Sequence, residues 1–151
     1  MRAEYTYQSL KSGTLKSERY YDGNGNPALV DGGYAAVEYV YAGDVMREKQ
    51  FKGTDGQLTL NSDGVAIIEY YYTLSNVKQE SFYDTQRRPV LSSAGYHQGN
   101  YTYKDGKKAT ETFVDTEGNP VNPSSKKAVT TEYAYDKNGR ITQETYLGAQ
   151  G

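Results

Sequence analysis

Tyrosine is the residue of this sequence whose type and spacing best suit a binding function. The chain has 17 tyrosines among 151 residues. A tyrosine ring can stack on the apolar face of a sugar while its hydroxyl bonds the sugar hydroxyls, and repetition lets weak sites add up through avidity. The tyrosines expected to bind a glycan are two that follow a linker glycine, Tyr34 and Tyr96, and then Tyr20, Tyr21, Tyr71 and Tyr83. The competing interpretation is that the tyrosines form cross-strand ladders that hold a thin sheet together.

Glutamates form two further rows. One row follows the tyrosines along the chain and consists of Glu18, Glu48, Glu80, Glu111 and Glu144, and the other precedes them and consists of Glu4, Glu38, Glu69 and Glu132. A glycosidase-like acid pair needs two carboxylates in different environments, and a residue repeated in every unit cannot mark one unique site. We therefore expect no catalytic residues. We expect each glutamate to occupy an exposed strand position beside basic neighbours such as Lys16, Arg19, Arg47, Lys49 or Lys78.

Two other groups could carry chemistry. The turns containing Asp22, Asn24 and Asn26, or Asp136 and Asn138, alternate oxygen ligands as calcium loops do, but no bidentate glutamate follows and turn geometry accounts for the same residues. We expect no metal and no cofactor, and leave calcium open as an alternative.

The one histidine, His97, has no second histidine or cysteine to share a metal. It is expected to be a surface or hydrogen-bonded residue.

The residues above belong to an internal repeat. A Tyr-x-Tyr pair recurs every 31 to 34 residues, starting at Tyr5, Tyr39, Tyr70, Tyr101 and Tyr133. Around each pair apolar and polar residues alternate with a period of two, which indicates strands. Turn residues such as Gly43-Asp44 and Asn138-Gly139 lie where a Tyr-x-Tyr strand must turn into the following glutamate strand.

The sequence therefore predicts an all-β protein of tandem β-hairpin repeats of about 31 residues, each with a linker that carries a short strand. The repeats are expected to form an elongated or curved antiparallel sheet or solenoid with almost no helix. We expect one repeat array over residues 1–151, with a half-unit at 1–17, units at about 18–47, 48–79, 80–110 and 111–143, and a partial unit at 144–151. We expect the array to be part of a longer protein; the alternative is that its first half-unit pairs with its last.

Several of these segments resemble known bacterial repeats. The segment from Glu132 to Glu144, which contains Tyr-Asp-Lys-Asn-Gly-Arg, resembles the YD repeat of Rhs-type proteins. The segment from Tyr20 to Pro27 is similar to the glucan- and choline-binding wall repeats of Gram-positive bacteria, although this chain has no tryptophan and a longer period. Nearly the whole chain resembles a group of bacterial tandem repeats that are often attached to surface or envelope enzymes. These resemblances imply a β-hairpin repeat but do not identify a ligand, because turn residues recur for conformational reasons.

Charge and composition exclude several partners. The net charge is −2 and the sequence pI is about 5.5, so the chain lacks the basic face that nucleic acid or an anionic membrane requires. No apolar run is long enough to span a membrane, and no cysteine is present to form a disulfide or a thiolate site.

We expect a non-enzymatic repeat module, extracellular or at the bacterial cell surface, that binds glycan or cell-wall polymer. The alternatives are a spacer or adhesin stalk with buried tyrosines, and an Rhs-like shell segment that wraps a partner polypeptide. Self-association through sheet edges is a further expectation. The exposure of Tyr34 and Tyr96 distinguishes the glycan-binding interpretation from the spacer.

Overall fold

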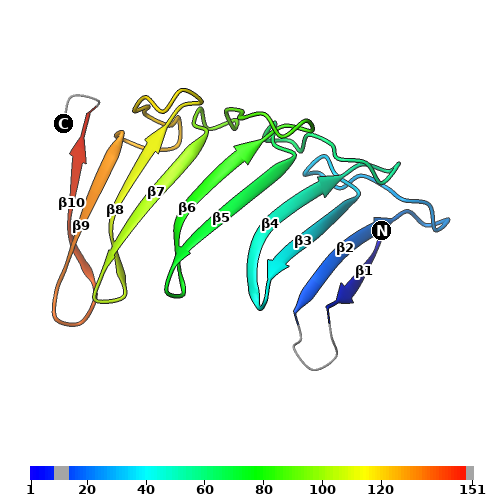
Figure 1. The fold of residues 1–151 in the computed structure, drawn as a ribbon, viewed down its shortest axis with the longest axis horizontal. Helices are drawn as coiled ribbons and strands as arrows, with labels where there is room; N and C mark the ends of the chain where they lie inside the picture. Colours follow the sequence, from blue (N-terminus) through cyan, green and yellow to red (C-terminus); the bar gives the residue numbers. More distant parts are fainter. Residues whose placement is uncertain (9–13, 149–151) are drawn as a thin grey trace. The chain divides into compact units, whose positions relative to one another are not determined.

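The computed structural model describes residues 1–8 and 14–148, and its regular elements are strands (Figure 1). The strands are β1 (Arg2–Tyr7), β2 (Leu15–Tyr21), β3 (Ala36–Ala42), β4 (Val45–Lys52), β5 (Ile67–Thr73), β6 (Asn76–Tyr83), β7 (Gln98–Lys104), β8 (Lys107–Val114), β9 (Thr130–Tyr135) and β10 (Ile141–Leu147). Within the described residues there is no helix, and so none that could cross a membrane.

The strands follow one another in the sheet in chain order, from β1 to β10, and each forms an antiparallel pair with the next. Each odd-numbered strand carries a Tyr-x-Tyr pair and forms a hairpin with the strand that follows it. The predicted all-β class and the tandem hairpins are confirmed.

The chain packs as two compact units. Unit 1 contains the described residues up to 69 together with 82–90, and it includes β1 to β4. Unit 2 contains residues 70–81 and those described from 91 onward, and it includes β7 to β10. Each unit is therefore built from complete hairpins and from part of the central hairpin, β5 and β6.

One five-residue loop recurs throughout the described chain. In each copy the first residue donates its N–H to the carbonyl of the fifth, and the fourth donates to the carbonyl of the first. The copies are 22–26, 30–34, 53–57, 61–65, 84–88, 92–96, 115–119 and 136–140. The fourth position has a positive φ in every copy, which favours glycine. Arg87 occupies this position in the loop at 84–88, with φ 60°.

The linkers between hairpins consist mainly of these loops. The expected short strand in each linker is reduced to a single bridge, as between Tyr21 and Pro27 or between Tyr83 and Pro89. The second linker has the same single bridge between Lys52 and Leu58, so the proline at the bridge in the other linkers is not what limits the pairing.

Burial is concentrated at the linker end of the hairpins. The core residues include Val37 and Ile67 near the start of odd-numbered strands, and Phe51, Phe82 and Phe113 near the end of even-numbered ones. Toward the opposite end, where the hairpins turn (Figure 1), the strands become exposed. The hydrophobic core therefore holds only one end of each hairpin.

Backbone pairing between successive hairpins is also limited to a short stretch at the linker end. Within a hairpin the ladder covers most of both strands, but β2 pairs with β3 over only three residue pairs, from Ser17–Glu38 to Arg19–Ala36. The β4–β5, β6–β7 and β8–β9 ladders are of the same length. Toward the turns, some other contact must hold neighbouring hairpins together.

Candidate functional site

At three junctions between described hairpins, the first tyrosine of a Tyr-x-Tyr pair bonds the glutamate of the preceding hairpin. In unit 1, Tyr39 of β3 donates its hydroxyl to Glu18 Oε1 of β2 at 3.1 Å. In unit 2 the same bond joins Tyr101 to Glu80 Oε1 at 2.6 Å and Tyr133 to Glu111 Oε1 at 2.9 Å. The repeated tyrosines and glutamates are thus partners, because a phenol supplies a donor to a carboxylate that can only accept.

The second tyrosine of the pair bonds a backbone carbonyl three residues before that glutamate. The hydroxyl of Tyr41 donates to the Leu15 carbonyl at 2.7 Å. In unit 2, Tyr103 donates to the Val77 carbonyl at 2.8 Å, and Tyr135 donates to the Lys108 carbonyl at 2.7 Å. We call the two bonds together the tyrosine clamp.

The clamp lies where the backbone ladder between hairpins has stopped. The last ladder residue of β2 toward the turn is Ser17, and Leu15 lies two residues beyond it. The carbonyl of Leu15 therefore receives a side-chain hydroxyl in place of a backbone donor from β3. Tyr41 thus extends the contact between β2 and β3 toward the hairpin turn.

The environment of the clamp keeps the phenols protonated. Burial raises the pKa of Tyr101, and its hydrogen bond to Glu80 raises it further. Burial and the nearby Glu18 carboxylate raise the pKa of Tyr39 in the same way. Burial, followed by a hydrogen bond to Glu18, raises the pKa of Tyr20 to about 12. Loss of any of these protons would place two negative oxygens side by side.

The glutamate row is not an exposed row, so that expectation was wrong. Glu18, Glu48 and Glu80 are half-buried, the Glu111 side chain is 2% exposed, and only Glu144 is exposed. These carboxylates can be buried because hydrogen bonds from the tyrosine hydroxyls offset the free-energy cost of removing them from water. In the other row, Glu38 does pair with basic neighbours as expected, with Arg19 at 3.2 Å and Lys52 at 3.7 Å.

The structure also corrects the alignment of the second hairpin. Glu18 lies opposite Tyr5 and Glu111 lies opposite Tyr101, whereas the residue opposite Tyr39 is Lys49. Lys49 therefore holds the repeat position to which Glu48 was assigned, and Glu48 points to the other face of the sheet. The recurring apolar residues mark the true register, because Phe51 aligns with Phe113 only when Lys49 aligns with Glu111.

Glu48 has a different partner. It lies opposite Glu69 in the β4–β5 ladder, where two like charges oppose each other. Arg87 forms two hydrogen bonds to it, from Nη1 to Oε1 and from Nη2 to Oε2, each at 3.0 Å. The hydrogen bond to Arg87, which outweighs the effect of burial, lowers the pKa of Glu48. This ion pair explains why an arginine occupies a loop position that favours glycine.

Glu111 is the most enclosed carboxylate of the clamps. It accepts from Lys126 Nζ at 2.8 Å, from Lys108 Nζ at 3.1 Å and from Tyr133. Burial raises the pKa of Glu111, but the bonds from Lys126, Tyr133 and Lys108 lower it by more. Lys126 lies in the linker between β8 and β9, which has no Gly-Tyr pair. It bonds Glu111 in the way that Tyr96, in the linker between β6 and β7, bonds Glu80 at 3.3 Å. A carboxylate held ionised in this way is suited to binding its partners rather than to taking up a proton.

Tyr34 and Tyr96, the first two predicted glycan-binding residues, are only partly exposed. The Tyr34 ring packs on Phe51 with 5.1 Å between ring centroids, and the Tyr96 ring packs on Phe113 at 4.7 Å. Each ring thus covers the aromatic core residue of the next hairpin. The other predicted residues are dispersed: Tyr20, Tyr21 and Tyr83 are half-buried on β2 and β6, and Tyr71 is 47% exposed on β5. In unit 1, Tyr20 and Tyr21 line one hollow and Tyr34 lines another.

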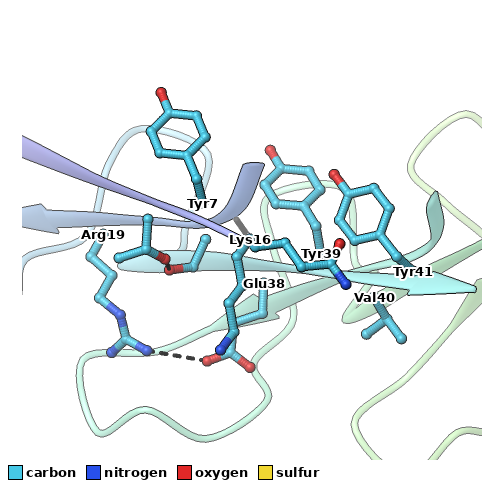
Figure 2. Close-up of a pocket in the computed structure, with 10 residues that line it drawn as sticks. Tyr7, Lys16, Arg19, Glu38, Tyr39, Val40 and Tyr41 are labelled. Carbon is cyan, nitrogen blue, oxygen red and sulfur yellow. Dashed lines mark hydrogen bonds and ion pairs between the residues drawn. The ribbon is translucent and has the colours of Figure 1, made fainter. Parts of the chain in front are cut away.

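A different hollow lies in unit 1, beside the first clamp. It has a volume of about 840 Å³, and its lining includes Tyr7, Tyr39 and Tyr41 together with Lys16 and Glu38. Figure 2 shows the three tyrosine rings projecting to the same side of the strands, with Arg19 and Glu38 on the other side. Tyr7 is the most accessible of the three rings, at 53%. Sequence reasoning placed these tyrosines in ladders and did not select them as a site.

The aspartates of the loops are used by the backbone. Asp22 Oδ1 accepts the N–H groups of Asn24 and Asn26 at 2.8 and 2.9 Å. These bonds lower the pKa of Asp22. Among residues 1–8 and 14–148 no three His, Cys, Asp or Glu side chains gather into a cluster that could hold a metal ion.

His97 is buried, at 8% exposure, rather than on the surface, and its backbone N–H donates to the Val114 carbonyl. It directly precedes β7, the strand that carries Tyr101, and this position is alanine or valine in the other repeats. Its burial therefore follows from its place at the linker end, where the core lies.

Comparison with known proteins identifies no family for this chain. No protein-family model matches it, and no curated protein matches it in sequence. The repeat architecture and the contacts between hairpins therefore carry the functional argument.

Proposed function

We propose that this chain is a non-enzymatic structural repeat module, a spacer or scaffold in which tyrosine clamps hold successive hairpins in register. The observation that carries the proposal is that both hydroxyls of a Tyr-x-Tyr pair are used inside the protein, on a carboxylate and a carbonyl of the preceding hairpin. A hydroxyl that donates its proton within the protein cannot donate it to a sugar.

The burial of the linker tyrosines supports the same function. A glycan-binding module with its sites at Tyr34 and Tyr96 needs exposed rings, and both rings instead cover phenylalanines. The rings contribute to a core that is poor in leucine and isoleucine. They are thus part of what holds each linker onto the next hairpin.

The setting of the module is also part of the proposal. The resemblance to bacterial surface repeats and to the YD repeat suggests a location outside the cell or on its surface. The Tyr-Asp-x-x-Gly-Arg segment lies at a hairpin turn, since Asp136–Arg140 joins β9 to β10. An Rhs-like shell segment is a scaffold of the same kind, and its partner would be a polypeptide.

Single-molecule force spectroscopy tests the scaffold function. The chain is stretched from its two ends, and the unfolding force is compared between the wild type and a Tyr41→Phe/Tyr103→Phe/Tyr135→Phe variant. Three hydroxyls are removed without loss of ring volume, so we expect a lower unfolding force. A Tyr5→Phe/Tyr7→Phe variant is the matched control, because the hydroxyls of these two residues form no clamp bond among the described residues. Equal forces in all three proteins would contradict the proposal.

The hollow beside the first clamp favours a second candidate, the binding of a glycan or cell-wall polymer. Its lining includes the exposed ring of Tyr7, which lies on the side of the strands opposite to Arg19 and Glu38, and an accessible ring of this kind can stack on a sugar. Its site is then at β1 to β3 and not at the linker tyrosines.

Cosedimentation with insoluble peptidoglycan and with α- and β-glucans separates the two candidates. Saturable binding that is lost in Tyr7→Ala, and retained in a folded Tyr34→Ala/Tyr96→Ala variant, supports a glycan site in the hollow. Binding that is lost only in the Tyr34→Ala/Tyr96→Ala variant would place the glycan site at the linker tyrosines instead. Absence of binding to every polymer leaves the scaffold as the function.

A further inference from the structure

An exposed leucine recurs at one position of three successive linkers. Leu29, Leu60 and Leu91 are spaced by 31 residues, and they are 54%, 48% and 48% exposed. Each follows a residue whose N–H donates to the preceding strand, as Ala28 donates to the Tyr20 carbonyl. The chain has only eight leucines, and none of the described ones belongs to the buried core. Each of these linkers thus presents a large apolar side chain to solvent.

The fold does not require leucine at this position. In the fourth linker the same position is Asn122, which is also exposed. The residue before it, Val121, donates its N–H to the Phe113 carbonyl, so the backbone follows the same course with asparagine. A single exposed leucine is ordinary on a protein surface. Its recurrence where the fold accepts asparagine indicates contact with another molecule.

Two of these leucines lie on adjacent linkers of unit 1. The loops that follow Leu29 and Leu60 are in direct contact, since the Ser62 N–H donates to the Gly32 carbonyl at 2.8 Å. Both leucines occupy the same position relative to their own hairpins, so they face the same side of the linkers. We call these two leucines, together with the exposed residues of linkers 22–35 and 53–66, the leucine surface.

The leucine surface carries a negative charge. Its two linkers contain four aspartates and no lysine or arginine. Three of the aspartates, Asp31, Asp55 and Asp63, are exposed. In the third linker, by contrast, Arg87 and Arg88 precede the leucine. Carboxylates beside apolar side chains are complementary to a partner that combines lysine or arginine with apolar residues.

We propose that the leucine surface of unit 1 binds a basic polypeptide segment that carries apolar side chains. The apolar side chains of the segment cover Leu29 and Leu60, and its lysines or arginines lie near the aspartates of the two linkers. An apolar centre with complementary charges around it is the usual arrangement of a protein interface. The leucine surface is separate from the tyrosine clamps, so the proposal adds a partner to the scaffold.

The charge also selects among other occupants. A second copy that used the same surface would bring two sets of aspartates together, and like charges across an interface weaken binding. An anionic lipid surface or a nucleic acid would be repelled in the same way. A basic polypeptide is the occupant that both the leucines and the aspartates favour.

Fluorescence anisotropy of labelled peptides, titrated with the whole chain, tests the proposal. The probe is a synthetic peptide that alternates leucine and lysine, and its controls alternate leucine with glutamate or glycine with lysine. We expect saturable binding of the leucine–lysine peptide that weakens as the salt concentration rises, and binding about tenfold weaker or less for each control. No saturable binding of the leucine–lysine peptide, or equal binding of the leucine–glutamate peptide, would overturn the proposal.

The repeats themselves supply substitutions that the fold accepts. Leu29→Asn/Leu60→Asn introduces the residue type that the fourth linker has at this position, and it is expected to weaken binding about tenfold. Leu91→Asn, the same change in the linker that contains Arg87, is the matched control and is expected to bind as the wild type does. Equal weakening in the two variants, or none in the first, would overturn the proposal.

A second variant tests the charge. Asp31→Ser/Asp63→Ala copies the third linker, where Ser93 and Ala94 occupy these positions, and it should weaken binding and reduce its dependence on salt. Unchanged binding would contradict the proposal. Sedimentation equilibrium without peptide identifies a different occupant: a mass above the 16.9 kDa of one copy, restored to one copy by the leucine substitutions, would assign the surface to a second copy instead. Urea unfolding of the variants, expected to match the wild type, separates loss of binding from failure of the tyrosine clamps.

Discussion

Replacement of Tyr101 by phenylalanine removes the shortest tyrosine–glutamate bond of the three described clamps and little else. The Tyr101 hydroxyl is 2.6 Å from Glu80 Oε1, and the ring stays in place against Phe113. A hydrogen bond to a charged group contributes about 1.5–3 kcal/mol to stability. Because Glu80 keeps its bond from Tyr96, the lower end of that range applies, and we expect Tyr101→Phe to destabilise the protein by about 1.5 kcal/mol.

Urea unfolding followed by far-ultraviolet circular dichroism measures this change. With a slope of about 1–3 kcal/mol per molar urea, the midpoint should fall by roughly 0.5–1.5 M. Tyrosine fluorescence serves as a second probe, and coincident transitions justify the two-state free energy.

Tyr5→Phe is the matched control for this measurement. It is the same chemical change at the same repeat position, at a tyrosine that is 50% exposed and forms no described bond to a glutamate, so we expect a change within about 0.5 kcal/mol. Equal shifts of the two midpoints would refute the reasoning, because the loss would then not depend on the partner glutamate.

Three other predictions concern pH and the loops. Folding raises the pKa of Tyr101, so the stability that this residue adds is complete below the unfolded value of about 10 and is lost as the pH rises above that value. The urea midpoint should therefore fall between about pH 9 and 11, and the fall should be smaller in Tyr101→Phe than in the wild type. Leu74 is 96% exposed with φ 53°, so Leu74→Gly should stabilise the protein by about 1 kcal/mol in urea unfolding, and a loss of stability would contradict the assigned turn. Arg87→Ala loses the ion pair and keeps the strained backbone, whereas Arg87→Gly relieves the strain, so calorimetry should find the alanine variant less stable by about 1 kcal/mol; the reverse order would show that φ at this position carries no strain.

The fold was predictable because its signals are local. Alternation around Tyr39 and Tyr70 specifies strands, and glycine and asparagine at the turns specify where the strands end. The hairpin pairing of each Tyr-x-Tyr strand with the following strand needed no long-range information. The same loop recurs at 22–26 and 136–140, and its backbone hydrogen bonds favour the same residue types each time. The repeat can therefore be recognised from the sequence.

The clamps were not found from sequence because they depend on which strand lies beside which. Glu18 and Tyr39 are 21 residues apart, as are Glu80 and Tyr101, and Glu111 and Tyr133 are 22 apart. That nearly constant separation was a signal, but the glutamates were assigned in the sequence analysis to exposed positions paired with lysine and arginine. A charged residue in a strand is usually solvated, and only the packing of the next hairpin brings a phenol to it.

The register of the second hairpin was mistaken for a related reason. A glutamate at position 48 fitted the expected row by residue type, yet strand geometry places Lys49 there. One residue of slip reverses the face on which a side chain lies. Alignment on Phe51 rather than on charge would have avoided the error, since buried aromatic residues are fixed more firmly by packing than surface charges are.

A double-mutant cycle on Tyr39 and Glu18 tests the central claim most directly. Tyr39→Phe, Glu18→Ala and the combined variant are compared with the wild type by urea unfolding. If the tyrosine clamp joins the first two hairpins, the two changes are coupled by about 1 kcal/mol, and the combined variant is less destabilised than the sum of the single ones. Strict additivity of the two changes would show that the hydroxyl and the carboxylate do not stabilise each other, and would contradict the account.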